Sequence, residues 1–281
     1  MFGYGYYGAE VFKHRNERKT MTTFTTEDRM AVAPLQDRIT AWIKDYATKA
    51  GMKSLVVGIS GGIDSAVVSA LCARTGLHTV AVTMPIRQRP DLHDLSMRQG
   101  QWLAERFDNV RHEIIDLTTV FDEFENRLTT YPNLLGLANS RSRLRMVTLY
   151  QIAQSVQGIV VGTGNKVEDF GVGFYTKYGD GGVDISPIAN CYKTEVWQMG
   201  RELGILQEII DAPPTDGLWD DGRTDQDQLG GLSYTELELA MKQDNNELPI
   251  ANTEEHDRVI QYRRIRARSL HKMNPIPVFK K

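Results

Sequence analysis

Residues 54–75, SLVVGISGGIDSAVVSALCART, constrain the fold more than any other part of the chain. The continuous apolar run at 55–59 is typical of a strand that is buried on both faces. A glycine turn, Ser60-Gly61-Gly62, follows this run and leads into an apolar-periodic segment that ends before Gly76, a helix stop signal. The order of strand, glycine turn and helix predicts the first unit of a parallel α/β sheet.

The glycine turn predicts a phosphate site. Backbone N–H groups at a helix start point toward one spot, and the helix dipole makes that spot attractive to anions. The turn is not a Walker A loop, because Ile63, Asp64 and Ser65 follow the glycines where that motif requires a lysine. An aspartate beside a phosphate suits magnesium, which is usually held by one or two carboxylates together with phosphate oxygens. The plainer alternative is an ordinary βα turn without a ligand.

Predicted strands and helices alternate between residues 34 and 161. This alternation predicts a doubly wound, mostly parallel sheet with helices on both faces. Ligands of such sheets lie beyond the carboxyl ends of the strands, so the turns at 60–62 and 162–165 are expected to face one cleft. Further strands are expected at 78–83, 111–115 and 158–161, helices at 34–51, 96–107, 117–128 and 138–155, and a proline-bearing loop at 84–95.

The sequence beyond residue 165 is less regular. Residues 171–184 carry five glycines among aromatic and charged side chains and predict a binding loop. Residues 211–231 are acidic, rich in Pro and Gly and without periodicity, which is typical of a lid or of a disordered segment. Helices are expected at 194–203, 234–243 and about 254–271. Residues 1–30 have no period and are expected to be a flexible tail, with Met21 as an alternative start, which leaves one domain at 31–281.

Composition limits the partners and the compartment. A net charge of −3 and a pI near 6.1 argue against nucleic acid or an anionic membrane as the main partner, and small-molecule chemistry fits better. Cys72 and Cys191 are far apart in the sequence, so neither a zinc site nor a disulfide framework is predicted. The sequence has no run of 18 apolar residues and no apolar region typical of a signal peptide, so the cytoplasm is the expected compartment.

Seven motifs give the chain a family likeness. GISGGIDSA at 58–66 resembles the pyrophosphate loop of the N-type ATP pyrophosphatases, which have the adenine nucleotide alpha hydrolase-like fold. The other six motifs narrow the resemblance to the ammonia-dependent NAD synthetases, and the likeness runs in the same order from about residue 34 to the end. These motifs are SRLRM at 142–146, GTGN at 162–165, FYTKYGDGGVDISPI at 174–188, YKTEV at 192–196, PPTDGLW at 213–219 and DQLGGLSYTELE at 227–238.

The resemblance implies a two-step amide synthesis on deamido-NAD. The nicotinate carboxylate attacks the α-phosphate of ATP, magnesium pyrophosphate leaves, and ammonia displaces AMP from the acyl-adenylate to give NAD. Adenylation needs the charge of the leaving pyrophosphate to be neutralised, which suits the turn at 60–65 as hydrogen-bond donor and Asp64 as magnesium ligand. The chain has no room for the amidase domain of glutamine-using relatives, so free ammonia is the expected nitrogen source.

The resemblance also implies roles for single residues. Asp64, Lys193 and Asp180 are the implied catalytic residues, with Asp180 either a base for ammonium or a cap of its loop. A planar arginine suits a nicotinate carboxylate, but Arg143 could equally lie on a solvated helix face with Arg141 and Arg145. The implied ATP contacts are Gly58, Ile59, Ser60, Gly61, Gly62, Ile63, Asp64, Ser65, Thr163, Lys193 and Thr215, and the implied deamido-NAD contacts are Arg143, Lys177, Asp184, His271 and Lys272.

One stretch departs from the family pattern. The family has a second metal-binding acid between the GT turn and the TKYGDGG loop. Counting forward from Thr163 selects Glu168, whereas counting back from Asp180 selects Asp169. Both acids are candidates, and only one is expected to reach magnesium, because adjacent side chains seldom point the same way.

Two other functions stay open on the sequence. One is that of another ATP pyrophosphatase, such as a GMP synthetase-like amidase or a tRNA-thiolating enzyme, although the chain lacks paired cysteines for sulfur relay. The other is that of a nucleotide-binding regulator without catalysis. The chain retains Ser60, Asp64, Lys193 and Thr215, which argues against this alternative. The resemblance also implies a homodimer whose interface completes the deamido-NAD site.

Overall fold

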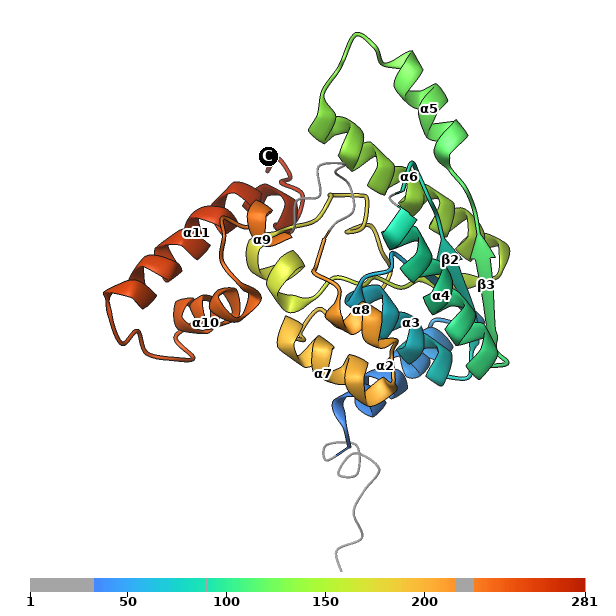
Figure 1. Ribbon diagram of the computed structural model, residues 1–281, viewed down its shortest axis with the longest axis horizontal. Helices are drawn as coiled ribbons and strands as arrows, with labels where there is room; N and C mark the ends of the chain where they lie inside the picture. The colour runs from blue at the N-terminus through green and yellow to red at the C-terminus, as the bar shows by residue number, and fades with distance from the viewer. Residues whose placement is uncertain (1–32, 89, 216–224, 281) are drawn as a thin grey trace, which may run out of the picture. The chain divides into compact units, whose positions relative to one another are not determined.

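A four-stranded parallel sheet in the order β3-β2-β1-β4 lies at the centre of the fold (Figure 1). Leu55 of the central strand pairs with Thr79 on one side and with Ile159 on the other. The predicted parallel α/β fold is therefore confirmed, although the last strand ends one residue earlier than expected. The strands are β1 (Ser54–Gly58), β2 (His78–Thr83), β3 (Val110–Ile114) and β4 (Gly158–Val160).

The computed structural model describes residues 33–88, 90–215 and 225–280. The chain divides after Ala33, and all of the helices and strands named below belong to the unit Pro34–Lys281. The expected tail at 1–30 and the central part of the expected lid, 216–224, lie outside the described residues. None of the described helices is both long and apolar enough to cross a bilayer.

Ten α-helices and one π-helix accompany the sheet in the described part of the chain. They are α2 (Leu35–Lys49), α3 (Ile63–Arg74), α4 (Pro90–Arg106), α5 (Thr118–Arg127), α6 (Leu134–Ser155), η1 (Lys166–Val172), α7 (Lys193–Leu203), α8 (Gln207–Asp211), α9 (Asp225–Gln228), α10 (Tyr234–Asp244) and α11 (Thr253–Met273).

Side chains of β1 alternate between two apolar cores. Leu55 and Val57 pack with α2, α3, α4 and α7 on one face of the sheet. Val56 packs with β2, α5 and α6 on the other face. Because both faces are covered, the strand consists of apolar residues without the polar alternation of a half-exposed strand. Helices on both faces of the sheet were predicted, and this prediction is confirmed.

A smaller apolar cluster lies beside the sheet and joins η1 to α10, α11 and the segment that follows α9. Its buried members include Val167 of η1, Leu237 of α10 and Tyr262 of α11. Figure 1 shows α9, α10 and α11 on the side of the fold opposite β3. We call this apolar cluster the C-terminal cluster. It holds η1 in place after the end of β4.

Five segments differ from the sequence prediction, and one of them is α9, a helix at 225–228 inside the lid expected at 211–231. Residues 90–95 belong to α4 rather than to a loop, since Pro90 suits a first helical position and Asp91 suits the positive end of the helix dipole. Helix α6 begins four residues early, because Asn133 Oδ1 accepts a hydrogen bond from Gly136 N at 2.7 Å. Residues 166–172 and 207–211 form helices where none was predicted.

Candidate active site

The glycine turn connects β1 to α3 and is held by hydrogen bonds between residues that are close in sequence. Ser60 N donates to Ser65 Oγ at 3.1 Å, Ser65 Oγ donates to Gly62 O at 3.0 Å, and Gly62 N donates to Ser60 Oγ at 3.2 Å. Gly61 has a φ of +90°, and a Cβ at this position would lie 2.7 Å from Leu92 O. Position 61 is therefore restricted to glycine both by its backbone conformation and by its neighbour.

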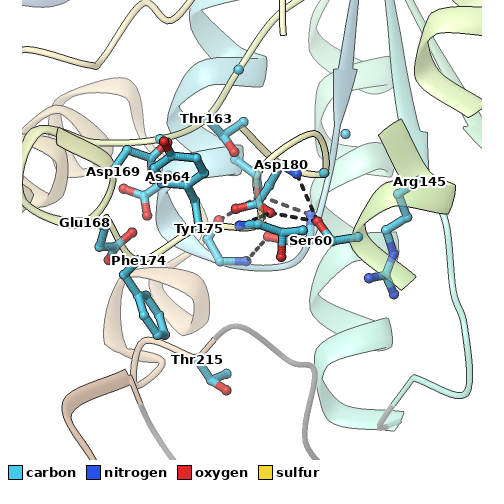
Figure 2. Close-up of a pocket in the computed structure, with 18 of the residues that line it drawn as sticks. Ser60, Asp64, Arg145, Thr163, Glu168, Asp169, Phe174, Tyr175, Asp180 and Thr215 are labelled. Carbon is cyan, nitrogen blue, oxygen red and sulfur yellow. Dashed lines mark hydrogen bonds between the residues drawn. The ribbon is translucent and has the colours of Figure 1, made fainter. Parts of the chain in front are cut away.

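A cavity of about 850 Å³ opens over this turn, and Gly62 and Gly162 both line it. The structure therefore brings the two glycine turns together at the carboxyl ends of β1 and β4. Figure 2 shows the acidic side chains Asp64, Glu168 and Asp169 on one side of the cavity and Arg145 on the other. Its wall contains Gly58, Ile59, Ser60, Gly61, Gly62, Ile63, Asp64, Ser65, Thr163, Lys193, Thr215, Arg143, Lys177, His271, Lys272, Asp180, Glu168 and Asp169.

Lys193, the first residue of α7, lies between two carboxylates. Its Nζ donates to Asp64 Oδ2 at 2.5 Å and to Glu168 Oε1 at 2.8 Å. The lysine is 2% exposed. Burial raises the pKa of Asp64 to about 6 even though the ammonium opposes this shift. Burial by itself would lower the pKa of Lys193, but the two carboxylates hold this pKa above its usual value.

Asn165 joins the acid at the start of α3 to the π-helix. Its Oδ1 accepts from Val167 N and Glu168 N, both at 3.0 Å, and so caps η1. Its Nδ2 donates to Asp64 Oδ1 at 3.4 Å. Asn165 is fully buried. One amide therefore fixes both the helix that carries Glu168 and the carboxylate that faces it.

The two adjacent acids of η1 have different surroundings. Glu168 Oε1 accepts from Lys193 and also from the hydroxyl of Tyr234, at 2.5 Å. The Asp169 carboxylate lies against Gly164 and leaves no room there for a Cβ. Burial, and then the charges of neighbouring carboxylates, raises the pKa of Asp169 well above its usual value. Burial likewise raises the pKa of Tyr234.

Asp180 anchors the glycine-rich loop to α6. Its Oδ1 accepts from Ser142 Oγ at 2.7 Å and from Thr176 N at 3.0 Å, and its own N donates to Ser142 Oγ at 2.9 Å. Burial raises the pKa of its carboxyl, although these hydrogen bonds oppose the shift. The predicted cap of this loop is present in the structure, and the carboxylate also lines the cavity.

The predicted substrate contacts come from three segments that meet at one side of the cavity. Arg143 Nε of α6 donates to Lys177 O at 3.2 Å. Lys177 Nζ donates to His271 O of α11 at 3.3 Å, and Lys272 Nζ donates to Tyr175 O at 2.8 Å. The guanidinium of Arg143 is therefore tied to the loop at 174–180 as well as exposed to solvent.

Asp184 lies outside the cavity wall, in contrast to the other predicted substrate contacts. Its Oδ2 accepts from Val160 N at 2.7 Å, and its Oδ1 accepts from Tyr150 OH at 3.1 Å. The next residue, Ile185, forms a parallel bridge with Val161. One carboxylate oxygen therefore holds the end of the glycine-rich loop against β4, and the other holds it against α6.

Three residues of the site were not predicted from the sequence, namely Asn165, Tyr234 and Arg145. Arg145 Nε donates to Met84 O at 2.9 Å and its Nη2 donates to Gln88 Oε1 at 3.0 Å, so it is not a solvated side chain. Burial lowers the pKa of Arg145 to about 10. Its spacing of three positions from the buried Ser142 is the signal that could have placed it on the inner face of α6.

The fold and the site together define a parallel α/β protein with a glycine turn beside an acid pair. A family model described as NAD synthase matches residues 35–275. The chain belongs to the NAD synthase family, as the resemblance of its motifs implied, and its fold is that of the adenine nucleotide alpha hydrolases.

Curated relatives and solved structures agree with this family. The chain is 36% identical over 218 residues to the NH(3)-dependent NAD(+) synthetase of Finegoldia magna, covering 77% of this chain and 87% of the relative. It is 40% identical over 215 residues to that of Alkaliphilus metalliredigens, covering 72% and 83%. A solved NMN synthetase from Francisella tularensis is 29% identical with a TM-score of 0.77, covering 88% and 98%. A solved NH3-dependent NAD synthetase from Campylobacter jejuni has a TM-score of 0.71 at 23% identity, covering 88% of this chain and 98% of that one. This likeness shows the fold alone.

Proposed function

We propose that the chain amidates deamido-NAD with ammonia and ATP, and forms NAD, AMP and pyrophosphate. The observation that carries this proposal is the family match over residues 35–275, which includes every motif of the cavity wall. The reaction needs an activated carboxylate and a site for the leaving pyrophosphate. The glycine turn at the start of α3 is suited to the second need.

Adenylation places the leaving pyrophosphate at the glycine turn. Backbone N–H groups of the turn and the hydroxyl of Ser60 can donate to its oxygens, and the positive end of the α3 dipole faces the same place. Lys193 lies within reach of the same wall and can neutralise further charge. The nicotinate carboxylate then bonds to the α-phosphorus of ATP while the bond to the pyrophosphate oxygen breaks.

The residues present fit a magnesium ion. Asp64 and Glu168 direct one oxygen each at a single cation, the ammonium of Lys193. No group of three or more His, Cys, Asp or Glu side chains suited to a metal occurs among the described residues. Two carboxylates completed by phosphate oxygens match the usual coordination of magnesium. We assign Asp64 and Glu168, rather than Asp169, as its protein ligands, and a bound magnesium ion would neutralise the pyrophosphate charge.

The second step needs ammonia in its neutral form. Ammonium gives up one proton, and the nitrogen of the resulting ammonia bonds to the acyl carbon while the bond from that carbon to the phosphate oxygen breaks and AMP leaves with its electron pair. The nitrogen loses a second proton to solvent, which gives the neutral amide. We assign the first proton to Asp180, because both of its hydrogen-bond donors bind Oδ1 and Oδ2 can accept from ammonium. Its role as cap of the loop is compatible with this one.

A homodimer and a cytoplasmic location complete the proposal. Helix α6 exposes the apolar side chains of Leu134 and Val147, at 75% and 57%, and α5 exposes Phe124, at 43%. An exposed apolar face of this kind suits a second copy of the chain. Cys72 and Cys191 are free thiols, which suits the reducing cytoplasm.

The test is a steady-state assay with magnesium, ATP, ammonium and deamido-NAD. Pyrophosphate and NAD are expected in equal amounts. Release of orthophosphate, or turnover that does not depend on deamido-NAD, would contradict the proposal. Sedimentation of the same sample separates monomer from dimer.

A second candidate function is the amidation of nicotinate mononucleotide. It is favoured by the likeness to the solved NMN synthetase, whose TM-score and identity exceed those of the Campylobacter structure. The acid and the amide chemistry are the same in both reactions, and only the adenylate half of the substrate differs. Parallel assays with the two acids distinguish them, and we expect the larger kcat/KM for deamido-NAD.

A further inference from the structure

Tyr234 reaches the active site from the C-terminal cluster. It is the first residue of α10, and its side chain is buried. A capping box fixes the start of this helix, since Ser233 Oγ accepts from Glu236 N at 3.3 Å and Ser233 N donates to Glu236 Oε2 at 2.9 Å. The backbone from which the tyrosine side chain extends is therefore held in one conformation.

The hydroxyl of Tyr234 lies between two carboxylates. It is 2.5 Å from Glu168 Oε1 and 3.3 Å from Asp225 Oδ2. A phenol carries one proton and donates it to one acceptor at a time. Because a strong O–H···O bond is shorter than 3.0 Å, the geometry assigns this proton to Glu168.

The ring of Tyr234 is held on two sides. Trp197 of α7 packs against it edge to face, with ring centroids 5.7 Å apart and an interplanar angle of 89°. The ammonium of Lys193 lies 4.9 Å from its centroid. The same ammonium donates to Glu168 Oε1, so this one oxygen receives both donors. The Glu168 carboxylate cannot rotate without losing both hydrogen bonds.

We propose that Tyr234 is a positioning residue that orients the Glu168 carboxylate for the divalent cation accompanying ATP. The inference rests on the proposed function, because it takes Glu168 as a cation ligand. Tyr234 is not part of the cavity wall, so it acts through Glu168. Groups that hydrogen bond to a metal-ligating carboxylate set its orientation, and their loss typically weakens metal binding. Helix α10, far from β1 in sequence, is thereby made a support of the site.

The test compares Tyr234→Phe with Tyr262→Phe in the full chain. Tyr262 is a matched control, because it is buried in the same cluster but donates to a backbone carbonyl, Gly171 O, at 3.3 Å. Mn²⁺ binding is measured by electron paramagnetic resonance in the presence of α,β-methylene-ATP, which cannot be cleaved at the α-phosphate. Tyr234→Phe is expected to weaken Mn²⁺ binding about 10- to 100-fold. Tyr262→Phe is expected to leave it unchanged.

Two further readouts separate positioning from simple loss of stability. In Tyr234→Phe the Mg²⁺ concentration for half-maximal activity is expected to rise, whereas the KM for deamido-NAD is expected to stay the same. Equal weakening of Mn²⁺ binding in both variants, or wild-type binding in Tyr234→Phe, overturns the inference. If thermal melting shows that Tyr234→Phe does not fold, Trp197→Phe replaces it. That variant replaces the indole packed against Tyr234 with a smaller phenyl ring, and unchanged Mn²⁺ binding there also overturns the inference.

The same experiments distinguish this inference from the proposed function. A wild-type chain that binds Mn²⁺ with the nucleotide analogue but forms no NAD refutes the amidation and leaves the role of Tyr234 to be decided by its variant. A wild-type chain that forms NAD but binds no Mn²⁺ refutes the positioning role and leaves the amidation standing.

Discussion

The glycine turn at 60–65 and a second region, the acid cluster, are assembled in different ways. The acid cluster consists of Asp64, Glu168, Lys193 and Tyr234. Hydrogen bonds within the turn join residues no more than five positions apart, between Ser60 and Ser65. In the acid cluster, Lys193 reaches Asp64 across 129 positions and Tyr234 reaches Glu168 across 66. The turn is therefore fixed by β1 and α3, whereas the acid cluster forms only when α7 and the C-terminal cluster have packed in place.

The largest effect is expected at Asp64, which belongs to both regions. It is the second residue of α3 and accepts from Lys193. In Asp64→Asn the carboxylate charge that holds the cation is lost, so pyrophosphate release should fall at least about 100-fold while the chain stays folded. Asp45→Asn is the control, since that carboxylate forms a surface pair with Lys49. A near-normal rate in Asp64→Asn would remove this residue from the mechanism.

The adjacent acids of η1 sharpen the comparison next. Glu168→Gln should raise the Mg²⁺ requirement and lower kcat by about 10- to 100-fold, because Glu168 shares the ammonium of Lys193 with Asp64. Asp169→Asn should change the Mg²⁺ dependence much less, since its carboxylate lies against Gly164. Initial rates over a Mg²⁺ titration measure both. If the two variants lose activity to the same small extent, neither acid is a cation ligand.

The glycine turn can be distorted by a substitution that alters no charge. In Gly61→Ala the alanine would have to adopt the φ of +90°, and its Cβ would clash with Leu92 O. The turn should therefore distort, and the KM for ATP should rise. Gly204→Ala is the matched control, because it has a φ of +70° with nothing within 4 Å of the added Cβ. Both variants should lose about 1 to 2 kcal/mol of unfolding free energy from the backbone conformation. Only Gly61→Ala should lose nucleotide affinity, and equal ATP KM values would separate the turn from ATP binding.

The smallest effect is expected at the sheet edge away from the site. His112 of β3 contacts Thr83 Oγ1 at 3.0 Å, and burial lowers its pKa below 6.5. The unfolded chain therefore takes up this proton first as the pH falls, so stability decreases below pH 6.5 until the folded pKa is passed. As the pH falls through this range, the melting temperature of the wild type should drop more steeply than that of His112→Gln, and the activity should be unaffected. Identical slopes would exclude His112 as the source.

The same contrast explains what could be predicted from the sequence. The strand, glycine turn and helix at 54–75 are local, so their pattern predicted the parallel sheet and the turn at its carboxyl edge. The motifs at 162–165 and 192–196 placed Thr163 and Lys193 by resemblance, and both line the cavity.

The rest depended on contacts that local patterns do not carry. The choice between Glu168 and Asp169 rests on a seven-residue π-helix, and no periodicity rule predicts such an element. Tyr234 was predicted only as the start of a helix, because nothing in its neighbourhood indicates a partner 66 residues away. Asp184 shows the reverse case, in which a motif residue serves the backbone of β4.

The loop between Thr176 and Asp184 is held at its middle and at its end before any ligand arrives. Asp180 holds it to α6, and Asp184 holds it to the end of β4. The loss of conformational entropy needed to order this loop is thus incurred during folding rather than during binding. A ligand that meets Lys177 and Asp180 in this loop keeps more of its interaction free energy as affinity, and its association rate should show little dependence on loop rearrangement.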